Sequence, residues 1–142
     1  IKKMSYKIIG KYIKDLNFSI PNPKTFFLLS KNISNYKINI DIKSAQVKQN
    51  IIEVLTSLSL TPVKDDFEKI NTKIVYATII EISDDKINKN EIEKIVLVEI
   101  PSQIYGELRK IFINLFENSG FKEIQISETV DFNKLYNMRK AQ

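Results

Sequence analysis

The apolar residues of this chain change their spacing once, at Pro101. Before that residue, apolar side chains recur at every second position in several segments; after it, they recur three or four positions apart. Alternation by two gives a β-strand one apolar face, whereas spacing by three and four gives a helix one apolar stripe. Strands followed by helices are typical of the α+β class, in which helices pack on one face of an antiparallel sheet.

Five segments are predicted to be strands: residues 6–20, 36–43, 51–63, 73–82 and 91–100. Residues 36–43 give the clearest signal, because apolar and polar residues alternate without interruption. In residues 6–20 the apolar residues occupy mainly even positions, and Gly10 favours a bulge or bend. The next two segments carry apolar residues on both faces. Short polar loops predict that neighbouring strands pair antiparallel.

Two helices are expected in the last third of the chain. Apolar residues recur at helical spacing up to Gly120, which is expected to end the first helix in a left-handed conformation. Gly106 lies inside this pattern and predicts a break after the first turn or a close backbone contact. A short apolar stretch, residues 121–126, precedes the second helix. Asp131 is its expected N-cap, and it should run to about Lys140.

A sheet with apolar residues on both faces must bury both faces, and two helices can pack against only one of them. The other face is then expected to meet a second subunit or a ligand. The alternative is that the second set of apolar residues forms only a half-exposed rim of the sheet. A separate apolar run, residues 26–29, falls in an expected loop after Pro23. It either folds back into the core or forms the wall of a groove for an apolar chain; from the residues alone both possibilities stay open.

Residue types needed for common catalysis are missing. The 142-residue chain, long enough for one domain over residues 1–142, has no cysteine and no histidine, and its three glycines are far apart. Zinc sites built from cysteine and histidine, glycine-rich phosphate loops and nucleophile motifs are therefore excluded. The aspartate pairs at 65–66 and 84–85 lie in predicted turns, where solvated aspartate is usual. We expect no enzyme activity, no metal and no cofactor.

The net charge of +5 comes from lysines that alternate with acids along most of the chain. Nucleic-acid surfaces are normally concentrated patches or stripes, so a basic nucleic-acid-binding domain is the least favoured reading. No apolar run approaches the ~20 residues that span a bilayer, which predicts no direct membrane insertion. The absence of cysteine fits a reducing, cytoplasmic setting.

Three segments resemble the SecB family of bacterial export chaperones. Residues 12–23 read YIKDLNFSIPNP, similar to the family's Y-x-K-D-[IL]-S-F-E-x-P-x-x-P opening. Residues 101–111 resemble its P-x-x-[IL]-[FY]-P-[FY]-A-R-x-x-I helix start, and residues 130–136 its [IV]-[DN]-F-x-x-L-[FY] segment. The order and spacing match over nearly the whole chain, and the first motif is the most specific.

The resemblance implies a four-stranded antiparallel sheet with a long helix and a shorter C-terminal helix. It also implies a dimer of dimers in which long helices pack between the dimers. Because the implied sheet has four strands, residues 91–100 would be the continuation or the partner of a neighbouring strand, and their place stays open. The residues expected at the interface are Ile104, Leu108, Ile111 and Leu115. The residues expected in the client-binding groove are Phe18, Pro21, Phe26, Phe27, Leu135 and Tyr136.

The family's function implies a holdase, a chaperone that keeps unfolded secretory preproteins from folding before export. The resemblance further implies docking to the export ATPase SecA, with four candidate contacts: Asp15, Ser19, Val75 and Ala77. Ser19 and Ala77 stand where the family commonly has acids, and Asp15 is retained. A SecB-like chaperone dedicated to one partner, such as an antitoxin, is the alternative function.

Overall fold

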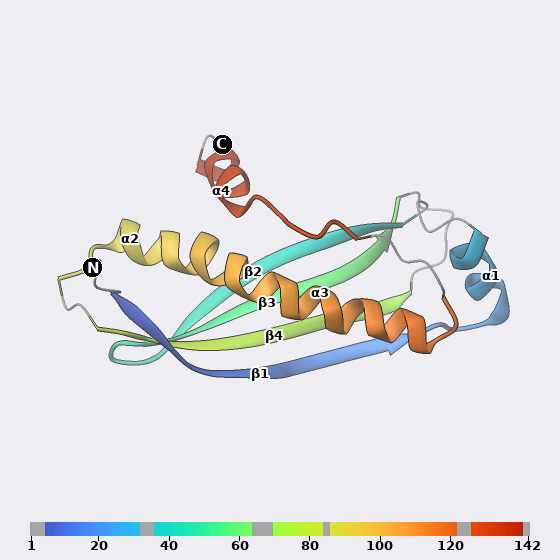
Figure 1. Ribbon diagram of the computed structural model, residues 1–142, viewed down its shortest axis with the longest axis horizontal. Helices are drawn as coiled ribbons and strands as arrows, with labels where there is room; N and C mark the ends of the chain where they lie inside the picture. Colours follow the sequence, from blue (N-terminus) through green and yellow to red (C-terminus); the bar gives the residue numbers. More distant parts are fainter. Residues whose placement is uncertain (1–4, 32–35, 64–69, 84–85, 122–125, 141–142) are drawn as a thin grey trace.

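The computed structural model describes residues 5–31, 36–63, 70–83, 86–121 and 126–140. The elements in chain order are β1 (Tyr6–Ser19), α1 (Pro23–Lys31), β2 (Tyr36–Lys48), β3 (Ile51–Pro62), β4 (Asn71–Ile82), α2 (Lys89–Lys94), η2 (Ile95–Glu99), α3 (Ile100–Asn118) and α4 (Phe132–Lys140). Figure 1 shows a long sheet with α2, η2 and α3 running along it as one continuous rod. The expected α+β class, with a four-stranded antiparallel sheet, a long helix and a short C-terminal helix, is confirmed.

The strands lie in the order β1-β4-β3-β2, and every pair is antiparallel. The expectation that neighbours in sequence pair is confirmed for β2 with β3 and for β3 with β4. It is wrong for β1, which crosses over through α1 to pair with β4. Asn50, in the turn between β2 and β3, has a φ of 65°, a left-handed conformation that asparagine tolerates better than most residues. Strands β1 and β2 are thus the two edges of the sheet.

The segment 91–100 is helical, so the prediction of a fifth strand was wrong. Asn88 starts α2, because its side-chain oxygen accepts a hydrogen bond from the Glu91 N–H at 2.9 Å. Pro101 lacks the N–H that an α-helix would use, and a π turn accommodates such an interruption. In that turn the Ile100 N–H bonds the Ile95 carbonyl, five residues earlier. The proline that suggested a boundary therefore lies inside a continuous helical rod.

Residues 26–29 belong to helix α1, so the expected loop was also wrong. Asn22 precedes Pro23, and its side-chain oxygen accepts the Thr25 N–H at 2.9 Å. A capping asparagine followed by proline at the first helical position is a helix start, because proline's fixed φ suits that position. Leu29 is buried, whereas the Phe27 side chain is 58% exposed. The helix therefore turns part of its apolar run outward.

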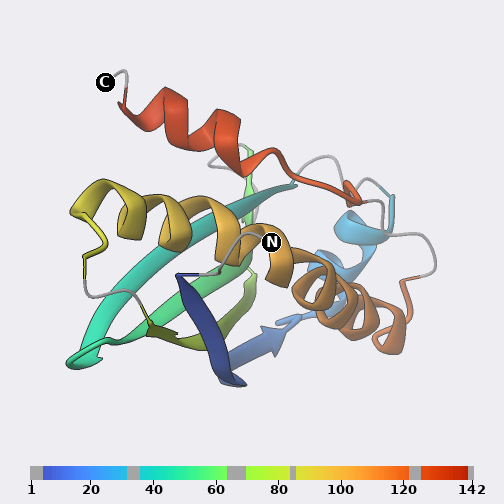
Figure 2. The same cartoon turned by 60° about the vertical axis from the view of Figure 1, so that its left-hand side comes forward.

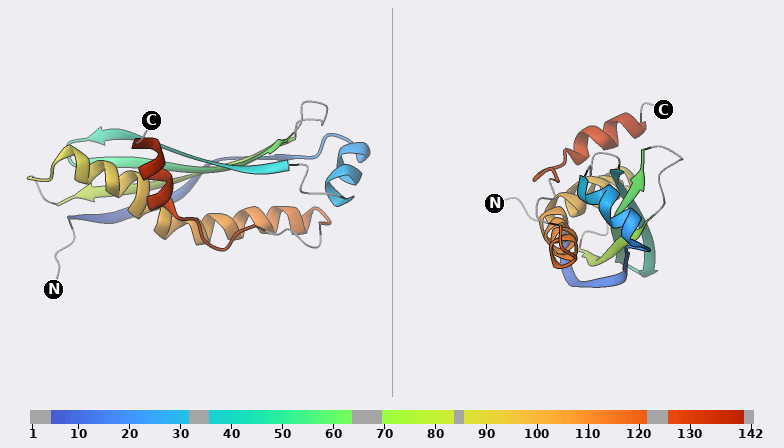
Figure 3. Two further views of the ribbon diagram at one scale, coloured as in Figure 1. Left: turned by 90° about the horizontal axis from the view of Figure 1, so that it is seen from above. Right: turned by 90° about the vertical axis from the view of Figure 1, so that its right-hand side faces the viewer.

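The core lies between the sheet and α3. Figure 3 shows the sheet as one layer and the rod of α2, η2 and α3 as the other. The side chains of Ile104, Leu108, Phe112 and Phe116 have no exposed surface. They meet the even-numbered residues of β3 and β4, among which Leu58 and Ile74 are also fully buried. Alternation by two places these residues on one face of the sheet, as expected.

The edge strand β1 departs from its predicted pattern. Its register against β4 shifts between Ile8 and Gly10, which confirms the bulge expected at the glycine, and again between Ile13 and Asp15. Each bulge inserts one residue and exchanges the faces of the residues that follow. The first bulge therefore turns Tyr12, expected to be buried, away from α3, and it is 41% exposed. The second bulge returns Leu16 to the face of its partner Ile74, where it is still 39% exposed on the edge strand.

The helix ends match most of the sequence predictions. Gly120 has a φ of +96°, and its N–H bonds the Glu117 carbonyl as α3 ends. The Asp131 side chain accepts the Lys134 N–H at 3.0 Å and so caps α4. The break or close contact predicted at Gly106 is wrong: α3 is continuous there, and no atom lies within 4 Å of the position that a Cβ would take. Most of the stretch 121–126 lies outside the described residues.

Candidate functional site

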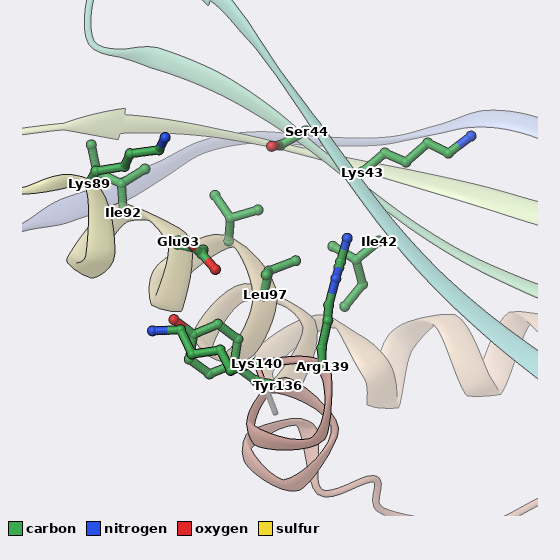
Figure 4. Close-up of a pocket in the computed structure, with 11 residues that line it drawn as sticks. Ile42, Lys43, Ser44, Lys89, Ile92, Glu93, Leu97, Tyr136, Arg139 and Lys140 are labelled. Carbon is green, nitrogen blue, oxygen red and sulfur yellow. The ribbon is translucent and has the colours of Figure 1, made fainter. Parts of the chain in front are cut away.

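An open groove lies between the edge strand β2 and helix α4. It contains a cavity of about 780 Å³, a volume within the range of ligand pockets. A smaller cavity of about 180 Å³ continues it and shares four lining residues with it. The groove residues, taken over both cavities, are Ile40, Asp41, Ile42, Lys43, Ser44, Lys89, Ile92, Glu93, Val96, Leu97, Phe132, Leu135, Tyr136, Arg139 and Lys140. Most of those around the larger cavity are labelled in Figure 4.

The walls of the groove come from strand β2, from α2 with η2, and from helix α4. Even positions of β2 turn Ile40 and Ile42 toward the helices, and α2 and η2 add an apolar wall on the second side. Helix α4 is anchored by Phe132, which is 2% exposed and lies edge-on to the Tyr105 ring with centroids 6.1 Å apart. Because α4 is docked mainly through Phe132 and Tyr136, its remaining turns stand away from β2 and leave the cavity between them.

The six residues expected in the client-binding groove fall into two groups. Leu135 and Tyr136 line the groove beside β2. Phe18, Pro21, Phe26 and Phe27 lie at or near α1, at the other end of the molecule, and Figures 1 and 2 both show α1 well separated from α4. The structure therefore presents two apolar regions on one chain.

The region at α1 is an aromatic cluster. Phe18 lies edge-on to Phe116 with ring centroids 5.0 Å apart, and Phe26 is 4.9 Å from Phe121. Phe27 packs on Phe26 at 5.8 Å and leaves most of its ring exposed. Edge-to-face and tilted packing of this kind is favourable for aromatic rings. The cluster closes the end of the core and offers Phe27 as an exposed apolar contact.

The four SecA-contact candidates lie together on β1 and β4. Asp15 pairs with Val75, and Ser19 pairs with Asn71. Ala77 pairs with Tyr12 and is fully buried. Odd positions of β4 face away from α3, so these residues share the helix-free face of the sheet.

The same face carries a charged network around Glu53. Its carboxylate accepts hydrogen bonds from the Lys14 ammonium, at 2.8 Å, and from the Tyr12 hydroxyl. The hydrogen bond from Lys14 and then that from Tyr12 hold the pKa of Glu53 below its usual value. The hydrogen bond to Glu53 raises the pKa of Tyr12 and that of Lys14. Glu53 and Lys14 are therefore a paired acid and base on this face.

The four residues expected at the interface between subunits fall into two groups by burial. Ile104 and Leu108 are fully enclosed by the chain's own core. They have no surface left for a second subunit. Ile111 and Leu115 are only partly buried at the margin of the core. A contact through the long helix would therefore use these two together with its polar outer side.

Sequence reasoning missed most of the groove. Ile92, Val96 and Leu97 were assigned to a strand, and Arg139 and Lys140 were not singled out. The Asn88 cap three residues before Glu91 was the available signal for a helix there. Nothing local to β2 shows that Ile40 and Ile42 lie under an open groove, because that depends on where α4 docks.

Among the residues that the structure describes, no group of three or more acidic side chains is placed to hold a metal ion. The aspartate pairs at 65–66 and 84–85 lie outside those residues. In the described part of the chain, no helix is both long enough and apolar enough to cross a membrane.

Comparison with known proteins identifies the sequence relatives. A family model described as preprotein translocase subunit SecB matches residues 2–142. The putative protein-export protein SecB of Pelagibacter ubique is 39% identical over 135 residues, which cover 95% of this chain and 96% of the relative. Protein-export protein SecB of Anaplasma phagocytophilum is 24% identical over 148 residues, covering 96% and 93%.

A solved structure has the same fold. It is a SecB-like chaperone of Mycobacterium tuberculosis in complex with a peptide from an antitoxin. The TM-score is 0.65 with 10% sequence identity, and the match covers 89% of this chain and 88% of the other. At that identity the likeness concerns the fold.

Proposed function

The chain belongs to the SecB family of preprotein translocase subunits, and from this premise we propose that it is a holdase that binds unfolded preproteins and delivers them to the Sec export machinery. The observation that supports this most directly is the groove between β2 and α4. It is open, and apolar side chains from β2, α2, η2 and α4 line it together with charged residues. Such a groove suits an extended apolar segment of an unfolded chain.

The physics of binding is that of mass action. A protein that binds the unfolded state of a client and not its folded state shifts the client's folding equilibrium toward the unfolded form. Each client side chain buried in the groove contributes about 1.5–3 kcal/mol. The groove and the exposed Phe27 at α1 lie far apart, so one client can engage both, and the second contact gains from a high effective concentration.

We further propose a dimer of dimers. Edge strand β1 has free ladder positions and exposes apolar side chains, among them Ile9 and Ile13 at 50% and 45%. An exposed apolar edge invites pairing with a second copy. Ile111 and Leu115 on α3 are the available contacts between dimers. SecA, in the cytoplasm, would dock on the helix-free face through Asp15, Ser19, Val75 and the backbone around Ala77.

The test is refolding of a slow-folding secretory precursor with and without the protein, with the native mass recorded in the same buffer. We expect stoichiometric protein to keep the precursor soluble and unfolded. Leu135→Ser and Phe27→Ser should each weaken this effect, because each removes an exposed apolar contact. Val47→Ser is the matched control, since Val47 is 59% exposed and lines neither cavity. Unchanged refolding with wild-type protein at several-fold excess would refute the holdase function.

A chaperone dedicated to one partner is the second candidate. It is favoured by the Mycobacterium tuberculosis neighbour, whose partner is an antitoxin peptide. The two functions differ in breadth. A general holdase should arrest several unrelated slow-folding precursors with similar efficiency, whereas a dedicated chaperone should arrest none of them and protect a single client.

A further inference from the structure

Some cations of this chain are held in ion pairs, and two cations at the groove are in none among the described residues. Three lysines on β1 are in ion pairs: Lys7 with Glu81, Lys11 with Glu107 and Lys14 with Glu53, at 3.2, 2.9 and 2.8 Å. At the groove, no ion pair is formed by Lys89 or Arg139 within the part of the chain that the structure describes. Across both cavities the groove residues include four cations, Lys43, Lys89, Arg139 and Lys140, and two carboxylates, Asp41 and Glu93.

The cationic side chains of Lys89 and Arg139 lie at the rim of the larger cavity, and apolar side chains line its interior. Lys89 comes from α2 and Arg139 from α4, so they approach the cavity from two sides. Figure 4 shows the Arg139 side chain extending from α4 toward strand β2. Ile42, Ile92 and Val96 lie between them. This arrangement combines an apolar recess with positive charge at both ends.

The carboxylates nearby do not cancel these charges. Glu93 lies one turn after Lys89 on α2 and also lines the cavity, but it forms no ion pair among the described residues. The Lys140 ammonium stacks over the Tyr136 ring at 4.9 Å from the centroid. Asp41, at an odd position of β2, lines the smaller cavity together with Arg139 but forms no ion pair among the described residues. Figure 4 shows Lys43 pointing away from the cavity. Over residues 5–31, 36–63, 70–83, 86–121 and 126–140, Lys89 and Arg139 therefore have no carboxylate partner within ion-pair distance.

We propose that the groove selects client segments in which an apolar side chain is flanked, within two residues, by aspartate or glutamate. This deepens the proposed holdase function and rests on it. The apolar side chain enters the recess, and the flanking carboxylate meets Lys89 or Arg139 at the rim. An extended segment advances about 3.3 Å per residue, so a flanking residue reaches from the recess to the rim. Charge complementarity of this kind sets specificity more than it sets overall affinity.

The test uses three labelled peptides with one apolar core, flanked by aspartate, asparagine or lysine, and measures binding by fluorescence anisotropy. At low salt we expect the aspartate peptide to bind about tenfold more tightly than the asparagine peptide, with the lysine peptide weakest. The preference should shrink at higher salt, because exposed charges are screened. The double variant Lys89→Gln with Arg139→Gln should bind all three alike, at the affinity of the asparagine peptide for the wild type.

Lys110→Gln is the matched control, because Lys110 is exposed on α3 and lines neither cavity. It should leave the preference intact. Equal affinity for the three peptides, or a preference that survives the double variant, would overturn the inference while leaving the holdase function standing. Failure of every peptide to bind would instead refute client binding itself. Stronger competition by a short oligonucleotide than by the aspartate peptide would also overturn it, by identifying a polyanion site.

Discussion

Helices α3 and α4 lie on the same side of the sheet, but they are held there in opposite ways. Helix α3 has five residues with no exposed surface: Ile100, Ile104, Leu108, Phe112 and Phe116. Helix α4 buries only Phe132 and Tyr136 and leaves Leu135 and Met138 46% and 56% exposed. The comparison separates two tasks. Tight packing of α3 stabilises the fold, whereas loose packing of α4 leaves a space that a client segment can fill.

Removing a buried aromatic ring of α3 should have the largest effect on stability. Phe112 is fully buried and packs on Phe116 with ring centroids 5.2 Å apart. We expect Phe112→Ala to lower the free energy of unfolding by about 3–5 kcal/mol, through lost burial and the cavity left behind. Urea denaturation followed by circular dichroism measures it. A loss below about 1 kcal/mol would show that α3 is not the main stabilising helix.

Removing the anchor of α4 should cost less and act locally. Phe132→Ala is expected to lower global stability by about 1–3 kcal/mol, because α4 can detach while the sheet and α3 stay packed. Hydrogen exchange should show the α4 amides exchanging much faster than those of α3, and client binding should fall. If the amides of both helices accelerate together, the two helices form one cooperative unit and the distinction drawn here is wrong.

Two glycines of the α3 region should respond to alanine with opposite signs. At Gly106 no atom lies within 4 Å of the added Cβ, so Gly106→Ala should stabilise the helix by about 0.5–1 kcal/mol. At Gly120 the φ of +96° disfavours any side chain, and Gly120→Ala should destabilise by about 1 kcal/mol. Thermal denaturation of the two variants side by side checks the signs. A destabilising Gly106→Ala would point to a contact between subunits at that position.

The smallest effect on stability is expected at Glu107, a half-exposed residue of α3. Glu107 accepts hydrogen bonds from Lys11 and Tyr76, at 2.9 Å each, and these lower its pKa, the bond from Lys11 most. A carboxyl whose pKa is lowered on folding contributes stability above its unfolded pKa of about 4.5 and loses it as the pH falls through the folded value.

Glu107→Gln should therefore cost a few tenths of a kcal/mol at pH 7, given that the site is half exposed, and close to nothing below both pKa values. Urea denaturation of both proteins at pH 7 and near pH 3 measures the difference. A cost that is the same at both pH values would mean that the packing of the side chain matters and its charge does not.

Three errors in reading the sequence have different physical origins. The run Ile95, Val96 and Val98 is apolar on more than one side, and such a run is ambiguous between a buried strand and a buried helix. Pro101 was read as a boundary because the π turn that accommodates it has no local signature. The apolar residues 26–29 were read as a loop, although the Asn22–Pro23 pair carried a usable cap signal.

The sequence by itself determined the β2, β3 and β4 strands, the amphipathic spacing of α3, the Gly10 bulge, the Gly120 end of α3 and the Asp131 cap, because each follows from interactions between residues near in sequence. Only the tertiary structure decided the pairing of β1 with β4, the exposure of Tyr12 and the groove beside β2. Those features depend on which distant elements meet, and a groove in particular is the space that two elements leave when they dock without filling it.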